Sequence, residues 1–139
     1  MFRHILIPVD LAESNKRAVD FAVNLAILSH SKITLLHVIE LIGNTTFEEF
    51  ADFYTPLQQQ AEAKMRILTA PHQDTTVVID YQIAYGDRTR EILRVAEVEG
   101  VDLLVMKSHQ VDPANPTQGW GTISHKIGIL AQCPVMLMK

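Results

Sequence analysis

Five short apolar segments alternate with segments of helical periodicity, and this alternation constrains the fold more than any other feature of the sequence. Four of the apolar segments are nearly continuous, which is typical of parallel strands buried on both faces. The third alternates apolar and polar residues, which predicts an edge strand. The pattern predicts one α/β domain over residues 1–139, an open parallel sheet with right-handed crossovers and helices on both faces. The five segments are 4–9, 32–38, 77–83, 102–106 and 134–138.

The helical segments carry recognisable start signals. Ser14, Asp87 and Thr122 stand where N-cap residues belong. Pro56 indicates that the second helix starts near it, so residues 41–56 are predicted to form a long connection. The inward-facing stripes are predicted to be Ala18, Phe21, Ala22, Leu25 and Leu28 in the first helix, Leu57, Ala61, Met65 and Leu68 in the second, Ile92, Leu93 and Ala96 in the third, and Ile123, Ile127 and Leu130 in the fourth.

Composition excludes several classes of protein. The formal net charge of −4 and the scattered basic residues argue against a nucleic-acid-binding protein. Cys133 is the only cysteine, so no internal disulfide forms and a reducing compartment fits. No apolar segment reaches membrane-spanning length, and the first residues do not match a signal peptide. We therefore expect a cytoplasmic protein without membrane insertion.

Four segments of the chain are informative together: "ILIPVDLAESNKRAVDFAVNLA", "LLHVIE", "YGDRTREILRVAEVEGVDLLVM" and "GTISHKIGILAQCPVMLMK". They resemble the universal stress protein family, and the resemblance extends over the chain except residues 41–76. The resemblance implies strand order 3-2-1-4-5, with a switch point between the first and fourth strands where such sheets bind ligands. It also implies a homodimer formed through the last strand, residues 134–138.

The segment after the fourth strand departs from the family's phosphate-binding motif. ATP-binding members carry Gly-x2-Gly-x9-Gly-Ser/Thr there, because glycine lets backbone N–H groups approach phosphate. In this chain Gly121 and Thr122 match the end of the motif, but Lys107 and Gln110 replace its first two glycines. The span from Gln110 to Gly121 is also one residue longer than the motif.

Two interpretations of this segment stay open. In the first, the larger side chains fill the anion pocket, and phosphate binding is lost or weak. In the second, Lys107 supplies a positive charge, and the start of the last helix at Thr122, Ile123 and Ser124 supplies N–H donors. We place the second ahead of the first, which predicts that an adenine nucleotide binds, with ATP as the first choice and Mg²⁺ only as part of the nucleotide complex.

The other half of the expected site follows the first and second strands. Pro8 and Val9 lead into Asp10, which matches the family acid beside the ribose. Asp10 could equally serve only to cap the loop before the first helix. Val38 matches the position whose backbone meets adenine, and it would be the buried end of the second strand in any case.

The residues do not indicate a catalytic site. Ser108 and His109 are adjacent, so their side chains diverge, and no acid is placed to orient the imidazole. We assign them at most a binding role. Paired carboxylates, a catalytic triad and metal-ligand spacing are not found in the sequence, so we expect at most slow ATP hydrolysis.

The sequence thus predicts a stress-response protein that senses or regulates through a bound adenine nucleotide. One alternative is a nucleotide-free dimeric protein of the same fold, which acts on an unidentified protein partner through the dimer or residues 41–56. A weaker alternative is an enzyme of the wider nucleotide-binding α/β group. The segment "VDLAESN" lacks the glycines that the adenylating members of that group use.

Overall fold

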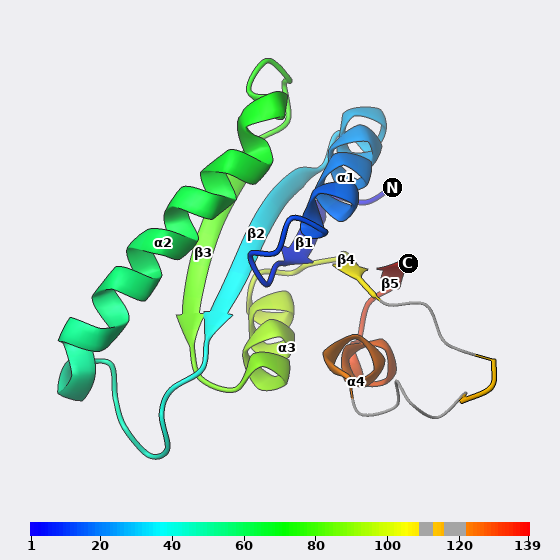
Figure 1. Cartoon of the computed structure of the whole chain (residues 1–139). Coiled ribbons are helices and arrows are strands. Elements are labelled where there is room, and N and C mark those ends of the chain that lie inside the picture. Colours follow the sequence, from blue (N-terminus) through cyan, green and yellow to red (C-terminus); the bar gives the residue numbers. More distant parts are fainter. Residues whose placement is uncertain (109–112, 116–121) are drawn as a thin grey trace.

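The computed structural model describes residues 1–108, 113–115 and 122–139 of the chain. Its five strands form one parallel sheet in the order β3-β2-β1-β4-β5 (Figure 1). This arrangement confirms the predicted fold class and strand order. The strands are β1 (His4–Pro8), β2 (Lys32–Ile39), β3 (Ile79–Tyr85), β4 (Leu103–Lys107) and β5 (Val135–Met138).

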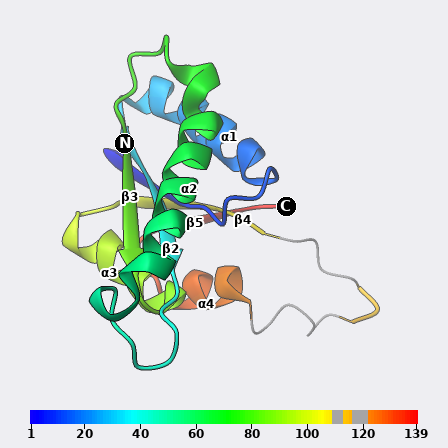
Figure 2. The ribbon, with the colours of Figure 1, turned by 60° about the vertical axis from the view of Figure 1, so that its left-hand side comes forward.

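Helices cover both faces of the sheet, because each crossover carries one. Helices α1 and α2 lie on one side of the strands, and α3 and α4 lie on the other (Figure 2). The helices are α1 (Asn15–Ser29), α2 (Ala51–Thr69), α3 (Arg88–Val98) and α4 (Ile123–Leu130), with 3-10 turns η1 (Glu48–Phe50) and η2 (Ala70–His72).

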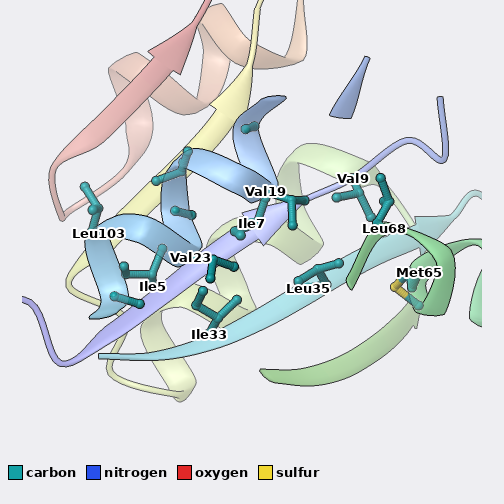
Figure 3. Close-up of a cluster of buried hydrophobic side chains, with 14 residues drawn as sticks. Ile5, Ile7, Val9, Val19, Val23, Ile33, Leu35, Met65, Leu68 and Leu103 are labelled. Atoms are coloured by element: carbon teal, nitrogen blue, oxygen red, sulfur yellow. The ribbon is translucent and has the colours of Figure 1, made fainter. Parts of the chain in front are cut away.

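The central strand β1 is buried along its whole length and separates two hydrophobic clusters. Ile5 and Ile7 of β1 face Val19 and Val23 of α1 in the first cluster (Figure 3). Leu6, which points to the opposite face, belongs to the second cluster under α3 and α4. Two-sided burial explains why the first strand reads as a continuous apolar run.

Three of the predicted helical stripes were partly wrong. Leu28 of α1 is 80% exposed and Leu130 of α4 is 52% exposed, although both were expected to face inward. Phe21 of α1 and Leu57 of α2 were also expected to face inward and are exposed, whereas the buried side of α1 includes Val19 and Val23. Helix α1 is apolar on more than one side, so tertiary packing decides which stripe meets the sheet.

Helix α2 begins five residues earlier than Pro56 indicates, so the predicted long connection was too long. The helix starts at Ala51 after η1, and Pro56 lies inside it. Tyr54 is fully buried, and its hydroxyl accepts a hydrogen bond from the N–H of Ile42 at 2.7 Å. The burial of this ring holds the first turns of the helix in place, which outweighs the one N–H that proline lacks.

The predicted N-caps of α3 and α4 are confirmed. Oδ2 of Asp87 accepts the N–H of Arg90 at 2.9 Å, and Oγ1 of Thr122 accepts the N–H of His125 at 3.3 Å. Ser14 precedes α1, but its backbone is already helical and its side chain makes no capping hydrogen bond. Its hydroxyl is instead engaged at the candidate functional site.

Candidate functional site

A cavity of about 770 Å³ opens at the carboxyl ends of β1 and β4, where the strand order reverses. The crossover after β1 leads to β2 on one side, and β4 pairs with β1 on the other (Figure 1). The loops that follow the two strands therefore diverge and leave a crevice between them, as expected for an open α/β sheet.

Nine of the sequence-predicted site residues line this cavity. They come from the ends of β1, β2 and β4 and from the start of α4, so elements far apart in the sequence meet there. Three other predicted residues, His109, Gln110 and Gly121, lie outside the described residues. The nine are Pro8, Val9, Asp10, Val38, Lys107, Ser108, Thr122, Ile123 and Ser124.

Asp10 organises the turn between β1 and α1 through one of its carboxylate oxygens. Oδ1 accepts the backbone N–H of Ala12 at 3.1 Å and the side-chain amide of Asn15 at 2.5 Å. Between them, Leu11 has a φ of 71°, a left-handed conformation that is unfavourable for a residue with a branched side chain. The loop-capping role considered for Asp10 is therefore present in the structure.

The second oxygen of Asp10 faces Lys107 across the switch point. The ammonium nitrogen of Lys107 lies 2.6 Å from Oδ2 of Asp10 and 2.8 Å from Oγ of Ser14. The side chains are 32% and 44% exposed for Lys107 and Asp10, so the pair lies at the mouth of the cavity rather than in the core. This contact explains why the Ser14 hydroxyl does not cap α1.

The surroundings of Asp10 keep its carboxylate ionised. Partial burial on its own raises the pKa, but hydrogen bonds from Lys107, Asn15 and Ala12 outweigh burial. The pKa of Asp10 therefore lies below its usual value of 3.8.

A group of hydroxyls surrounds the start of α4 on the other side of the cavity. Oγ of Ser108 lies 3.2 Å from Oγ of Ser124, which in turn lies 3.3 Å from Oγ1 of Thr122. The backbone N–H of Ser108 donates to the carbonyl of Met138 at 2.6 Å, so β5 fixes the end of β4 here. Hydroxyls beside a helix N-terminus favour an anion at this end of the cavity.

His37 of β2 is a polar cavity residue that the sequence analysis missed. Its Nδ1 lies 2.8 Å from the carbonyl oxygen of Val9, so Nδ1 carries the proton and Nε2 is the acceptor in the neutral ring. Burial lowers the pKa of His37 below 6.5, and the positive charge of Arg88 adds to that effect. The Val9 carbonyl and the charge of Asp10 act in the opposite direction and do not compensate.

Other cavity residues were missed although their positions could have been inferred. Asn15 and Arg17 lie in the first turn of α1, and Arg88 opens α3. A helix that follows a strand starts at the carboxyl edge of the sheet, so its first turn faces the site. Further lining residues that the sequence did not single out are Ser14, Ala18, Leu36, Ile92, Met106, Met138 and Lys139.

Within the described residues, no group of three His, Cys, Asp or Glu side chains is arranged to hold a metal ion. Among those same residues, no helix combines the length and the apolar character that crossing a membrane requires.

Comparison with known proteins places this chain in a family. The universal stress protein family matches residues 1–139. The universal stress protein YxiE of Bacillus subtilis is 26% identical over the full length of both chains. The universal stress protein MJ0577 of Methanocaldococcus jannaschii is 29% identical over 78% of each chain. The solved structure of UspA from Lactobacillus plantarum has a TM-score of 0.82 at 22% identity and covers 99% of this chain and 98% of its own. The chain belongs to the universal stress protein family.

Proposed function

We propose that this chain binds an adenine nucleotide in the cavity at the switch point and acts as a sensor or regulator in a stress response. The observation that carries the proposal is the charge of the cavity. Among the described residues, four basic side chains and one acidic side chain line it, in a chain whose formal net charge is −4. Positive charge concentrated in one cavity of an acidic protein favours an anionic ligand. The basic residues are Arg17, Arg88, Lys107 and Lys139.

The phosphates are assigned to the α4 side of the cavity. There the hydroxyls of Ser108, Thr122 and Ser124 gather, and the helix N-terminus favours negative charge. Three of the basic groups already have a partner. Arg17 donates to the carbonyl of Lys139 at 2.7 Å, Nε of Arg88 lies 3.7 Å from Oε1 of Glu40, and Lys107 is paired with Asp10. Lys107 is the basic side chain nearest in sequence to the hydroxyl group.

The nucleoside is assigned to the side formed by β1 and β2. The ionised carboxylate of Asp10 suits ribose hydroxyls as donors, and the buried end of β2 at Val38 offers apolar surface and backbone groups to a flat base. Leu36, Ile92 and Met106 add apolar lining. An acid on one side and hydroxyls with a helix N-terminus on the other match the two ends of a nucleotide.

Solved structures of the same fold support the choice of adenine. They include a universal stress protein in complex with cAMP (16% identity, TM-score 0.68), the protein from Archaeoglobus fulgidus in complex with dAMP (15%, 0.72) and a family protein from Arabidopsis thaliana with AMP bound (23%, 0.71). At these identities the likeness is one of fold. It supports adenine nucleotides as ligands that this fold accommodates, with ATP and its Mg²⁺ as our choice for this chain.

Calorimetric titration with ATP, ADP and AMP, each with and without Mg²⁺, tests the proposal. We expect saturable binding, with ATP tightest because it carries the most negative charge into a basic cavity. Adenosine and GTP serve as controls for the phosphate and the base. Failure of all three adenine nucleotides to bind at millimolar concentration would contradict the proposed function.

One observation favours a second candidate, a nucleotide-free dimeric interaction protein of the same fold. Lys107 carries a side chain where ATP-binding relatives have glycine, and that side chain is already ion-paired. Mass spectrometry of small molecules released by heating the purified protein separates the candidates. A released adenine nucleotide favours the sensor, and an empty site combined with no binding in calorimetry favours the interaction protein. Both candidates are consistent with a cytoplasmic homodimer paired through β5.

A further inference from the structure

Both carboxylate oxygens of Asp10 already carry hydrogen bonds. The loop and Asn15 use Oδ1, and the ammonium of Lys107 lies on Oδ2 at 2.6 Å. The loop contacts are part of the β1–α1 turn and cannot be given up without disturbing it. Oδ1 therefore has both of its lone pairs occupied, whereas Oδ2 has one left beside the Lys107 ammonium. A ribose that donates both of its hydroxyls to Asp10 must displace Lys107 from Oδ2.

A phosphate bound at the start of α4 would give the displaced ammonium a second partner. Lys107 lines the same cavity as Ser108 and Ser124, whose Oγ atoms lie 3.2 Å apart at the start of α4. A lysine side chain is a point charge on a flexible four-carbon stem, so it can change partners without moving the backbone. A phosphate near the α4 hydroxyls would be that new partner, whereas a ligand without phosphate offers none.

We propose that Lys107 is a specificity-determining residue that admits nucleotides and discriminates against nucleosides. Its ion pair with Asp10 occupies Oδ2 on the nucleoside side of the cavity. Only a ligand with phosphate gives the displaced ammonium a new partner. This inference rests on the proposed function and deepens it, because it assigns a role to the residue that replaces the first glycine of the motif. Glycine at this position would contact phosphate only through its backbone and could form no ion pair with Asp10.

The exposure of the pair sets the size of the effect. Since Lys107 and Asp10 are 32% and 44% exposed, water screens their attraction, and breaking the ion pair costs little free energy. Exposed pairs of this kind affect an equilibrium by about two- to fivefold, and a charge-assisted hydrogen bond to phosphate by about tenfold or more. Removing the ammonium should therefore strengthen adenosine binding slightly and weaken ATP binding strongly.

The test measures adenosine and ATP affinities for wild type, Lys107→Met and Lys107→Arg by calorimetry. Methionine keeps an unbranched stem and removes the charge, whereas arginine keeps the charge. We expect Lys107→Met to bind adenosine about two- to fivefold tighter and ATP about tenfold weaker. Lys107→Arg should keep the preference for ATP. Lys64→Met, at an exposed position of α2 away from the cavity lining, controls for the loss of one positive charge.

Three outcomes would overturn the inference. If ATP binds wild type but Lys107→Met changes both affinities equally or neither, Lys107 does not determine specificity, and the proposed function stands. If Lys107→Gly binds ATP more tightly than wild type, Lys107 only obstructs the phosphate loop. If neither ligand binds any of these proteins while their NMR spectra show folded chains, the proposed function fails and the inference fails with it.

Discussion

Lys107 at the end of β4 is ion-paired with Asp10 at the end of β1, with 2.6 Å between the ammonium nitrogen and Oδ2. The contact joins the two strands that flank the switch point. Lys107, which departs from the family's glycine motif, thus contacts the acid that follows β1. This relationship leads to a prediction that needs no ligand.

Lys107→Met should raise the pKa of Asp10. Partial burial already raises it, and the hydrogen bond and charge of Lys107 are among the groups that bring it below 3.8. Carbon-detected NMR titration of the Asp10 carboxyl between pH 2 and 6 measures the change. Because the wild-type pKa is depressed, the stability from this pair is complete above the unfolded pKa and is lost as pH falls through the folded pKa. An unchanged titration in Lys107→Met would show that the pair does not form in solution.

His37 should make folding less favourable in mild acid. Its pKa lies below 6.5, so the unfolded state binds more protons as the pH falls, and stability decreases from about pH 6.5 down to the folded pKa. His37→Asn, which can still donate to the Val9 carbonyl, should lose part of this dependence. Urea unfolding between pH 5 and 7.5 is the measurement. His30→Asn is the control, because His30 is an exposed cap of α1 with a left-handed φ of 56°, which asparagine tolerates. Equal pH dependence in wild type and His37→Asn would show that His37 does not cause the loss of stability in mild acid.

Tyr54→Phe should loosen the segment before α2. The change removes the hydroxyl that accepts the N–H of Ile42 and leaves the buried ring in place. We expect a loss of about 0.5–1.5 kcal/mol in the free energy of unfolding and faster hydrogen exchange at the Ile42 amide. Tyr81→Phe is a matched control, because it removes a hydroxyl that bonds Thr69 instead. Unaltered exchange at Ile42 would mean that Tyr54 does not anchor this segment.

Dimerisation through β5 is the prediction that a simple experiment tests most readily. β5 is the edge strand beside β4, its four residues are apolar, and each is only partly buried in the single chain. An apolar edge of this kind favours pairing with a second copy. Sedimentation at micromolar concentration should give a dimer that Met136→Lys weakens. Val98→Lys, at an exposed position of α3, should not weaken it. Because Met136 also packs on the core, thermal unfolding must show that the variant is folded. A wild-type monomer would contradict the prediction.

The fold was predictable because the continuous apolar runs leave few arrangements for the strands. The strand order came from the resemblance, and the cavity position follows from that order. Errors arose where sequence periodicity allows two answers, as in α1, where Leu28 faces solvent and Val19 faces the sheet. The segment 41–56 does not line the cavity, and Tyr54 packs against Tyr85 at the end of β3.

The partner of Lys107 could not be predicted. Sequence shows that glycine is replaced at the end of β4, but the ion pair depends on the β1–α1 turn. In that turn the strained Leu11 backbone and the contacts of Asp10 with Ala12 and Asn15 set where the carboxylate lies. Such a turn has no simple sequence signal, because left-handed backbone at leucine is uncommon.

An NMR titration with ATP tests most directly whether the switch-point cavity is a nucleotide site. The account predicts amide shifts that saturate at Val9, Val38, Ser108 and Ser124, which line the cavity on four different elements or their adjoining loops. Amides at the amino ends of the strands, such as those of Lys32 and Asp102, lie at the opposite edge of the sheet, and their chemical shifts should not change. Shifts confined to the opposite edge, or no shifts at millimolar ATP, would contradict it.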